Sequence, residues 1–197
     1  MIAIIDYKAG NIFSVKNALD YLGLECCLTS DADRIISADA LILPGVGAFP
    51  PAMKMLNDSG LTSVILSEAV KKPFLGICLG MQLLFERSFE FGDNRGLGLI
   101  PGYVGKIDET GLVVPHMGWN RLEILRKSPL LDESEYVYFV HSYKAFCSDE
   151  NVIAYCEYGS RVPALVTDGK TVFGAQFHPE KSGAAGLEIL RRFGELI

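Results

Sequence analysis

The pentapeptide GICLG at residues 76–80 constrains the fold of this chain more than any other stretch of its sequence. It follows an apolar, strand-like run at residues 73–75 and precedes the helix-like residues 81–85. A cysteine with a glycine two positions away on each side indicates a sharp strand-to-helix turn that lifts its side chain above the sheet. The positive end of the helix favours a thiolate there, and free backbone amides lie ready for an oxyanion. The sequence therefore predicts that Cys78 occupies a nucleophile elbow.

Strand-like and helix-like segments alternate in the first half of the chain. Short apolar runs predict strands at residues 2–6, 24–28 and 40–43. Helical spacing of apolar residues predicts a helix from a cap at Asn11 to a stop at Gly23, and another at 61–70. Strands that alternate with helices and lack polar alternation are typical of a parallel sheet with both faces covered.

The second half of the chain has a different pattern. Residues 98–158 are rich in short strands, which predicts antiparallel strands along one edge of the sheet. A core strand at 172–177 and a closing helix at 186–196 complete the pattern. We expect one domain over residues 1–197. Its fold class is α/β: a mostly parallel central sheet with helices on both faces, a nucleophile elbow and additional antiparallel strands.

Composition narrows the possible partners and location. The net charge of −6 argues against nucleic acid, because phosphate binding needs a basic face. The chain has neither a signal peptide pattern nor an apolar stretch long enough to span a membrane. Its five cysteines include no CxxC pair, which favours a reducing compartment over disulfides or zinc. We therefore expect a cytoplasmic protein in which four cysteines only pack: Cys26, Cys27, Cys147 and Cys156.

His178, Pro179 and Glu180 supply the base and the orienting acceptor that a cysteine nucleophile needs. The proline ends a predicted strand and bends the chain, so that Glu180 can turn back towards the His178 ring. A His-Pro-Glu turn on a surface would carry little weight alone, but this chain has only three histidines. Cys78 and His178 both follow predicted strands, whose carboxyl ends meet at one edge of a parallel sheet. The sequence predicts a Cys78–His178–Glu180 triad.

The loop at residues 44–47 (PGVG) follows another predicted strand and reaches the same edge. Two glycines around one valine let a peptide plane rotate at low steric cost. We expect the amides of Val46 and Gly47 to join that of Leu79 in an oxyanion hole. As a plain turn, this loop would need no function.

The segment GICLGMQ at 76–82, together with HPE at 178–180, resembles the class I (triad) glutamine amidotransferases. Five separated blocks resemble, within that class, the glutaminase subunits of imidazole glycerol phosphate synthase. They are DYKAGNIFSV (6–15), PGVGAF (44–49), GLGLIPG (96–102), PHMGWN (115–120) and YFVHSY (138–143). The resemblance spans nearly the whole chain and implies hydrolysis of glutamine through a thioester, without a metal or an organic cofactor.

The resemblance also implies roles in binding glutamine. Gln82 would contact the substrate, and Glu90 would take its α-ammonium group. Backbone groups around His141, Ser142 and Tyr143 would hold its α-carboxylate. Each position also has a purely structural explanation: a polar helix residue, a solvated charge or a half-buried strand aromatic.

The resemblance also implies a partner protein. The resemblance points to a heterodimer with the cyclase subunit of imidazole glycerol phosphate synthase, a (β/α)8 barrel that consumes the ammonia. Trp119, the single tryptophan, is expected in a loop that docks this partner.

Three other functions remain open from the sequence. A glutaminase subunit of a different synthase would carry the same triad. A cysteine hydrolase outside the class, such as a peptidase, would turn over peptides or esters and ignore glutamine. A degenerate docking subunit would have no activity, although the intact triad argues against it.

Overall fold

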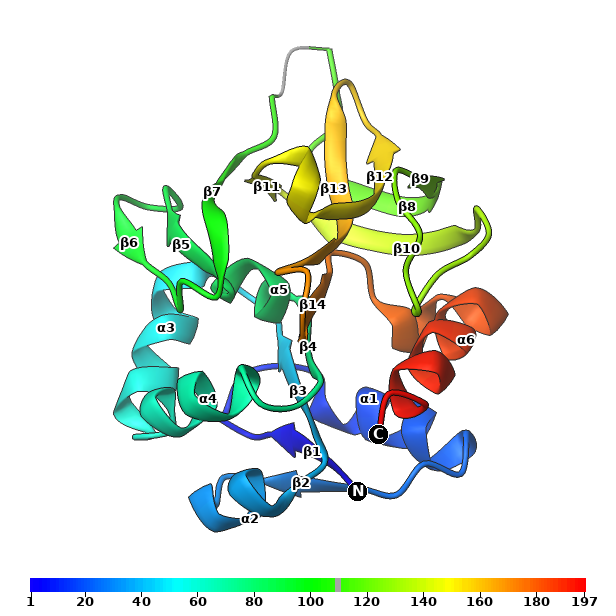
Figure 1. Ribbon diagram of the computed structural model, residues 1–197. Helices are drawn as coiled ribbons and strands as arrows, with labels where there is room; N and C mark the ends of the chain where they lie inside the picture. Colours follow the sequence, from blue (N-terminus) through cyan, green and yellow to red (C-terminus); the bar gives the residue numbers. More distant parts are fainter. Residues whose placement is uncertain (109–110) are drawn as a thin grey trace.

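The computed structural model describes residues 1–108 and 111–197. Its main sheet has the strand order β2-β1-β3-β4-β14-β13-β12-β9 (Figure 1). These strands are β1 (Ile2–Ile5), β2 (Cys26–Thr29), β3 (Ala40–Gly45), β4 (Phe74–Cys78), β9 (Glu123–Ile124), β12 (Val152–Glu157), β13 (Arg161–Thr167) and β14 (Val172–Ala175). The pairings from β2 to β14 are parallel, and those from β14 to β9 are antiparallel. The sheet is thus mostly parallel where the sequence predicts it.

Helices cover both faces of the sheet, as predicted (Figure 1). They are α1 (Ile12–Tyr21), α2 (Ala32–Ser37), α3 (Phe49–Asp58), α4 (Thr62–Ala69), α5 (Leu79–Leu83) and α6 (Gly183–Gly194), with two short 3-10 helices, η1 (Asp149–Asn151) and η2 (Pro179–Lys181). Successive side chains of β1 enter two separate cores. Ile2 and Ile4 pack in the core that includes α1 and α6, whereas Ala3 and Ile5 pack in the core that includes α2 to α5. This two-sided burial explains why the central strands lack polar alternation.

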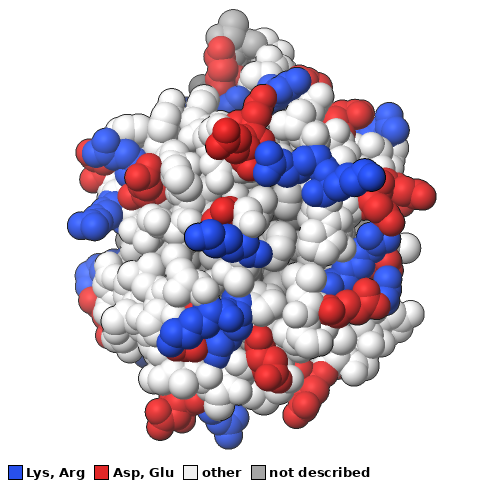
Figure 2. Space-filling model, viewed as in Figure 1, with Lys and Arg blue, Asp and Glu red and all other residues white. Residues whose placement is uncertain are grey.

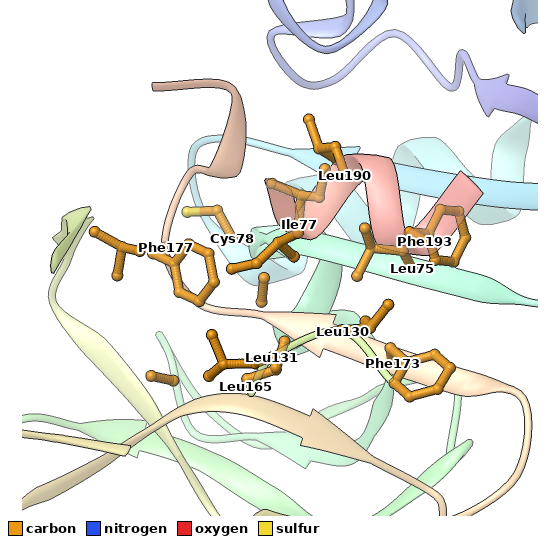
Figure 3. Close-up of a cluster of buried hydrophobic side chains, with 14 of the residues drawn as sticks. Leu75, Ile77, Cys78, Leu130, Leu131, Leu165, Phe173, Phe177, Leu190 and Phe193 are labelled. Carbon is orange, nitrogen blue, oxygen red and sulfur yellow. The ribbon is translucent and has the colours of Figure 1, made fainter. Parts of the chain in front are cut away.

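The core on the α1 and α6 side reaches the end of β4. Leu190 and Phe193 of α6 lie near Leu75 and Ile77 of β4 in Figure 3. Cys78 is at the margin of the same cluster. Apolar packing therefore anchors the strand that carries the predicted nucleophile.

Two helices were not predicted from the sequence. The six-residue helix α2 is short and is capped by Asp31, whose side chain accepts a hydrogen bond from the amide of Asp33. Helix α3 begins with two prolines in its first turn. Its buried residues Phe49, Ala52, Met53 and Leu56 have helical spacing, so a detectable signal was present.

The expected placement of all the antiparallel strands along one edge is wrong in part. Strands β13, β12 and β9 do extend the main sheet, but two further sheets stand apart from it. One pairs β10 (Tyr136–His141) with β8 (His116–Arg121), and the other has the order β11-β7-β5-β6. The strands of the latter are β5 (Phe85–Ser88), β6 (Asn94–Arg95), β7 (Ile100–Lys106) and β11 (Tyr143–Phe146). Only Ser142 separates β10 from β11, so the chain changes sheets within one residue, which alternation along the sequence does not reveal.

Lysine, arginine, aspartate and glutamate side chains are interspersed over the face of the molecule in Figure 2. This face has no dominant sign of charge. No helix in the described residues has the length and apolar character needed to cross a membrane.

Candidate active site

Cys78 is the last residue of β4 and stands immediately before α5. Its backbone has φ +55° and ψ −111°, a conformation that costs a residue with a side chain about 1–3 kcal/mol. The residue is 7% exposed. A strained cysteine between a buried strand and a helix is the geometry of a nucleophile elbow.

The two flanking glycines permit this turn because backbone approaches them closely. An ideal Cβ on Gly80 would lie 1.8 Å from the carbonyl oxygen of Leu43 in β3. One on Gly76 would lie 2.6 Å from the carbonyl oxygen of Gly80. Any side chain at either position would push apart β3, β4 and the first turn of α5.

His178 follows β14 and is held through its backbone. Its amide donates to the carbonyl oxygen of Tyr138 at 3.0 Å, and its own carbonyl accepts from the Ser182 hydroxyl at 2.6 Å. The Ser182 hydroxyl also accepts from the amide of Tyr138 at 2.9 Å. Strand β10 and the start of α6 therefore fix where the His178 ring is presented.

Glu180 turns back onto the His178 ring, as the sequence predicts. The distance from His178 Nδ1 to Glu180 Oε1 is 2.8 Å, and both side chains are buried. Because an ionised carboxylate only accepts, Nδ1 carries the proton, and Nε2 is the nitrogen left for Cys78. Cys78 is the other neighbour that acts on the His178 ring, and both residues line the same pocket.

The protonation of His178 reflects competition between burial and its two partners. Burial favours the neutral ring, but hydrogen bonds and charges from Cys78 and Glu180 outweigh it and raise the pKa of His178 to about 9. The ring is therefore protonated at neutral pH and has a proton to donate at Nε2. The second carboxylate oxygen, Glu180 Oε2, is buried without a hydrogen-bond partner among the described residues.

This pKa shift predicts a loss of stability at alkaline pH. The pKa of His178 is about 9 in the folded chain against 6.5 ordinarily, so its stabilisation is complete below pH 6.5 and disappears as the pH rises through 9. We expect the free energy of unfolding to fall by roughly 1–3 kcal/mol over this range. Denaturant unfolding at pH 6.5 and above pH 9 measures this change in the free energy of unfolding. The His178→Gln variant is the control. An equally steep fall in the His178→Gln variant would contradict the assignment.

A cavity of about 330 Å³ opens beside Cys78. Its lining includes ten residues that the sequence or the resemblance singled out: Val46, Gly47, Cys78, Leu79, Gln82, Glu90, His141, Ser142, Tyr143 and His178. Pro115 and Val140, which were not predicted, complete it. Glu180 is not in the lining, since it lies behind the His178 ring. Segments from three sheets thus converge on one pocket of the size that suits a small ligand.

Glu90 is a buried carboxylate at this pocket. Its Oε2 accepts a hydrogen bond from the amide of Phe49, the first residue of α3, at 2.7 Å. Burial raises the pKa of Glu90, and the Phe49 hydrogen bond opposes that shift only in part. In the described residues only burial and the Phe49 amide act on the Glu90 carboxylate, with no cation beside it, so it is suited to a cationic ligand group.

Gln82 lies one helical turn beyond Cys78. Its Nε2 donates to the Tyr143 carbonyl oxygen and to Gln176 Oε1, both at 3.0 Å. Gln176 is fully buried and was missed in the sequence, although it stands two residues before His178. Its partner Gln82 is 94 positions away, so no pattern in the sequence around Gln176 indicates the contact.

Tyr7 is a second residue that sequence reasoning missed. It follows β1, and its hydroxyl is buried without a hydrogen-bond partner in the described part of the chain. An ideal Cβ on Gly45 would lie 2.9 Å from this hydroxyl. Tyr7 therefore stands behind the loop that carries Val46 and Gly47.

Trp119 lies in a strand and not in the expected loop. It belongs to β8, where it pairs with Tyr138 of β10. Met117 and Trp119 alternate with the buried His116 and are 61% and 56% exposed. The pairing with β10 turns this segment into a strand, and the side-chain period of two puts both large apolar residues in solvent.

The remaining cysteines are suited to packing. All five cysteines are free thiols. Burial raises the pKa of Cys147 to about 11 and that of Cys156 to about 12, and burial together with Asp20 raises that of Cys26 to about 11. No cluster of three or more potential metal ligands occurs in residues 1–108 and 111–197.

This fold and this site define a class of protein. The family model for class-I glutamine amidotransferases matches residues 3–196, and the chain belongs to that family. Among its curated relatives, imidazole glycerol phosphate synthase subunit HisH of Listeria innocua is 54% identical, over 100% of this chain and 96% of the relative. The subunit HisH of Bacillus cereus is 53% identical, over 98% of this chain and 93% of the relative.

Solved structures agree on the fold. A crystal structure of a glutamine amidotransferase superposes with a TM-score of 0.78 at 21% identity, covering 100% of this chain and 98% of the other. The PurLQS structure from Thermotoga maritima gives 0.77 at 20% identity, covering 98% and 96%.

Proposed function

We propose that this chain is the glutaminase subunit of an imidazole glycerol phosphate synthase and hydrolyses glutamine to glutamate and ammonia. The observation that carries the proposal is the Cys78–His178–Glu180 arrangement at the mouth of a pocket with a buried acidic residue. More than half of the residues are identical to those of HisH subunits over nearly the full length of both chains.

The reaction follows from these parts. The proton of the Cys78 thiol passes to His178 and the sulfur attacks the carboxamide carbon of glutamine. The amides of Leu79, Val46 and Gly47 hold the oxyanion. His178 gives its proton to the departing nitrogen, the C–N bond breaks and ammonia leaves a thioester on Cys78. Water, deprotonated by His178, then attacks the thioester, which releases glutamate and restores the thiol. Glu180 keeps the His178 ring oriented throughout.

The pocket provides groups for both ends of an amino acid. Glu90 takes the α-ammonium group of glutamine, a role supported by its burial without a cationic partner in the described residues. Backbone groups around His141, Ser142 and Tyr143 hold the α-carboxylate. Gln82 contacts the substrate between these points and Cys78.

We place the partner over the exposed part of β8. The proposed partner is the cyclase subunit, a (β/α)8 barrel that forms a heterodimer with this chain in the cytoplasm and consumes the ammonia. Met117 and Trp119 offer large apolar side chains of the kind that anchors protein interfaces. Residues 1–197 would act as one glutamine amidotransferase domain.

Labelling with a glutamine-mimicking electrophile tests the proposal. We expect one label per chain, on Cys78, with protection by glutamine and faster reaction when the cyclase is added. Trp119→Ala should remove most of the acceleration and leave labelling of the isolated chain unchanged, because it weakens docking only. Labelling that ignores glutamine, or that falls on another cysteine, would contradict a glutaminase site.

A further inference from the structure

A partly buried chain of hydrogen bonds runs from β8 to the pocket beside Cys78. Asn120 Nδ2 lies 3.4 Å from His116 Nε2, and His116 Nδ1 lies 3.0 Å from His141 Nε2. His141 Nδ1 in turn lies 2.8 Å from the Tyr143 carbonyl oxygen, which Gln82 Nε2 also reaches at 3.0 Å. The His116 ring is clamped between the rings of Phe139 and Tyr158.

The two ends of this chain determine where every proton sits. The Tyr143 carbonyl can only accept, so His141 Nδ1 is protonated. Burial lowers the pKa of His141 to about 3, and the neutral ring then has an acceptor at Nε2. His116 must therefore donate from Nδ1, which leaves its Nε2 to accept from Asn120. The second contact of Asn120 Nδ2 is consistent with donation to His116, because the same nitrogen also donates to the carbonyl oxygen of Glu157.

The same carbonyl determines the orientation of Gln82. Only a nitrogen can stand 3.0 Å from the Tyr143 oxygen, and the second hydrogen of that nitrogen goes to Gln176 Oε1. Gln176 keeps this orientation although its own Nε2 is then buried without a partner among the described residues.

The remaining polar atom of Gln82 faces the cavity. Gln82 lines the pocket, and its Oε1 takes no hydrogen bond within the described residues. Yet Oε1 is not among the buried atoms that lack a partner, so it retains access to the pocket. At this point the pocket presents an acceptor, which suits a ligand N–H group and repels a ligand oxygen.

We propose that His141, supported by His116, is a positioning residue that fixes the Tyr143 carbonyl oxygen. This carbonyl and Gln176 then hold the Gln82 carbonyl oxygen towards the ligand. The pocket thereby selects an N–H donor there, either the carboxamide or the α-ammonium group of the substrate. The identity of this substrate as glutamine rests on the proposed function.

The first test uses the unchanged chain. With only three histidines in the sequence, long-range ¹H–¹⁵N spectra at pH 7 can resolve each ring. We expect neutral rings protonated at Nδ1 for both His116 and His141. Protonation at Nε2 on either ring would overturn the proposal, and this result does not depend on the folding of any variant.

The second test separates positioning from mere packing. His141→Leu removes the donor to the Tyr143 oxygen, whereas His141→Asn keeps an amide nitrogen near the place of Nδ1. For glutamine hydrolysis we expect KM to rise about tenfold in His141→Leu with kcat changed less than about threefold, and to return to within about threefold of the original in His141→Asn. Equal KM values in both variants, or a loss confined to kcat, would overturn the proposal.

Competitive inhibitors identify the ligand group that Gln82 contacts. If it is the carboxamide, His141→Leu weakens inhibition by glutaramate, which lacks the α-amino group, and spares inhibition by glutamate. If it is the α-ammonium, the pattern reverses. Unchanged inhibition by both would contradict the proposal. Absence of glutamine hydrolysis by the original chain, alone and with the cyclase, would instead refute the proposed function itself.

Discussion

Cys78→Ala is expected to reduce glutamine-dependent synthesis by the complex at least about a thousandfold, because no other group can form the thioester. Activity supported by added ammonia should stay within about twofold of the original, since ammonia bypasses the Cys78 site. Both rates are measured on the same complex with the cyclase. The loss is large because nucleophile, base and orienting carboxylate act as one unit.

Cys156→Ala provides the matched control. Cys156 is also buried but lies in β12, away from the pocket lining. It should keep both activities. If Cys78→Ala removed ammonia-dependent synthesis as well, Cys78 would be needed for structure or docking and not only for glutamine hydrolysis.

Gly80→Ala is expected to destabilise the chain by more than about 4 kcal/mol or to prevent folding. The added methyl group would lie 1.8 Å from the Leu43 carbonyl oxygen and 2.9 Å from its carbonyl carbon. The backbone at Leu43 and the backbone at Gly80 would therefore have to move apart. Neither β3 nor the elbow can yield easily, because both are buried in a close-packed core. Denaturant unfolding and the yield of soluble protein measure the effect.

Gly105→Ala is the control for this substitution. An ideal Cβ at Gly105 would lie 2.8 Å from the ring edge of Phe146, an exposed side chain that moves more easily than backbone. We expect a loss below about 1 kcal/mol there. A Gly80→Ala variant that unfolds at the same denaturant concentration as the original would show that the contact with Leu43 relaxes easily.

Much of the fold was predictable because its signals are local. The short apolar strands and the helices at 12–21 and 62–69 follow from composition and spacing. Helix α3 has the same kind of signal, but the prolines at its start obscured it. The pairings of β8 with β10 and of β11 with β7 could not be predicted from the sequence, because they join strands that are tens of residues apart.

The site divides in the same way. Cys78 between Gly76 and Gly80 is a five-residue motif, and His178 with Glu180 a three-residue one, so steric and hydrogen-bonding demands within each segment reveal their chemistry. The roles of Gln82 and Glu90 came from resemblance and stay proposals. No local demand marks Gln176 or the Tyr7 hydroxyl, which acquire their places only by packing against distant strands.

The nucleophile, its base and the strand-to-helix turn were thus readable in the sequence, because each depends on neighbours within a few residues. The direction in which Gln82 presents its amide was not. It is decided by the carbonyl of Tyr143, 61 residues away, which can only accept a hydrogen bond and so orients both Gln82 and His141. Only the folded chain brings that carbonyl to the pocket.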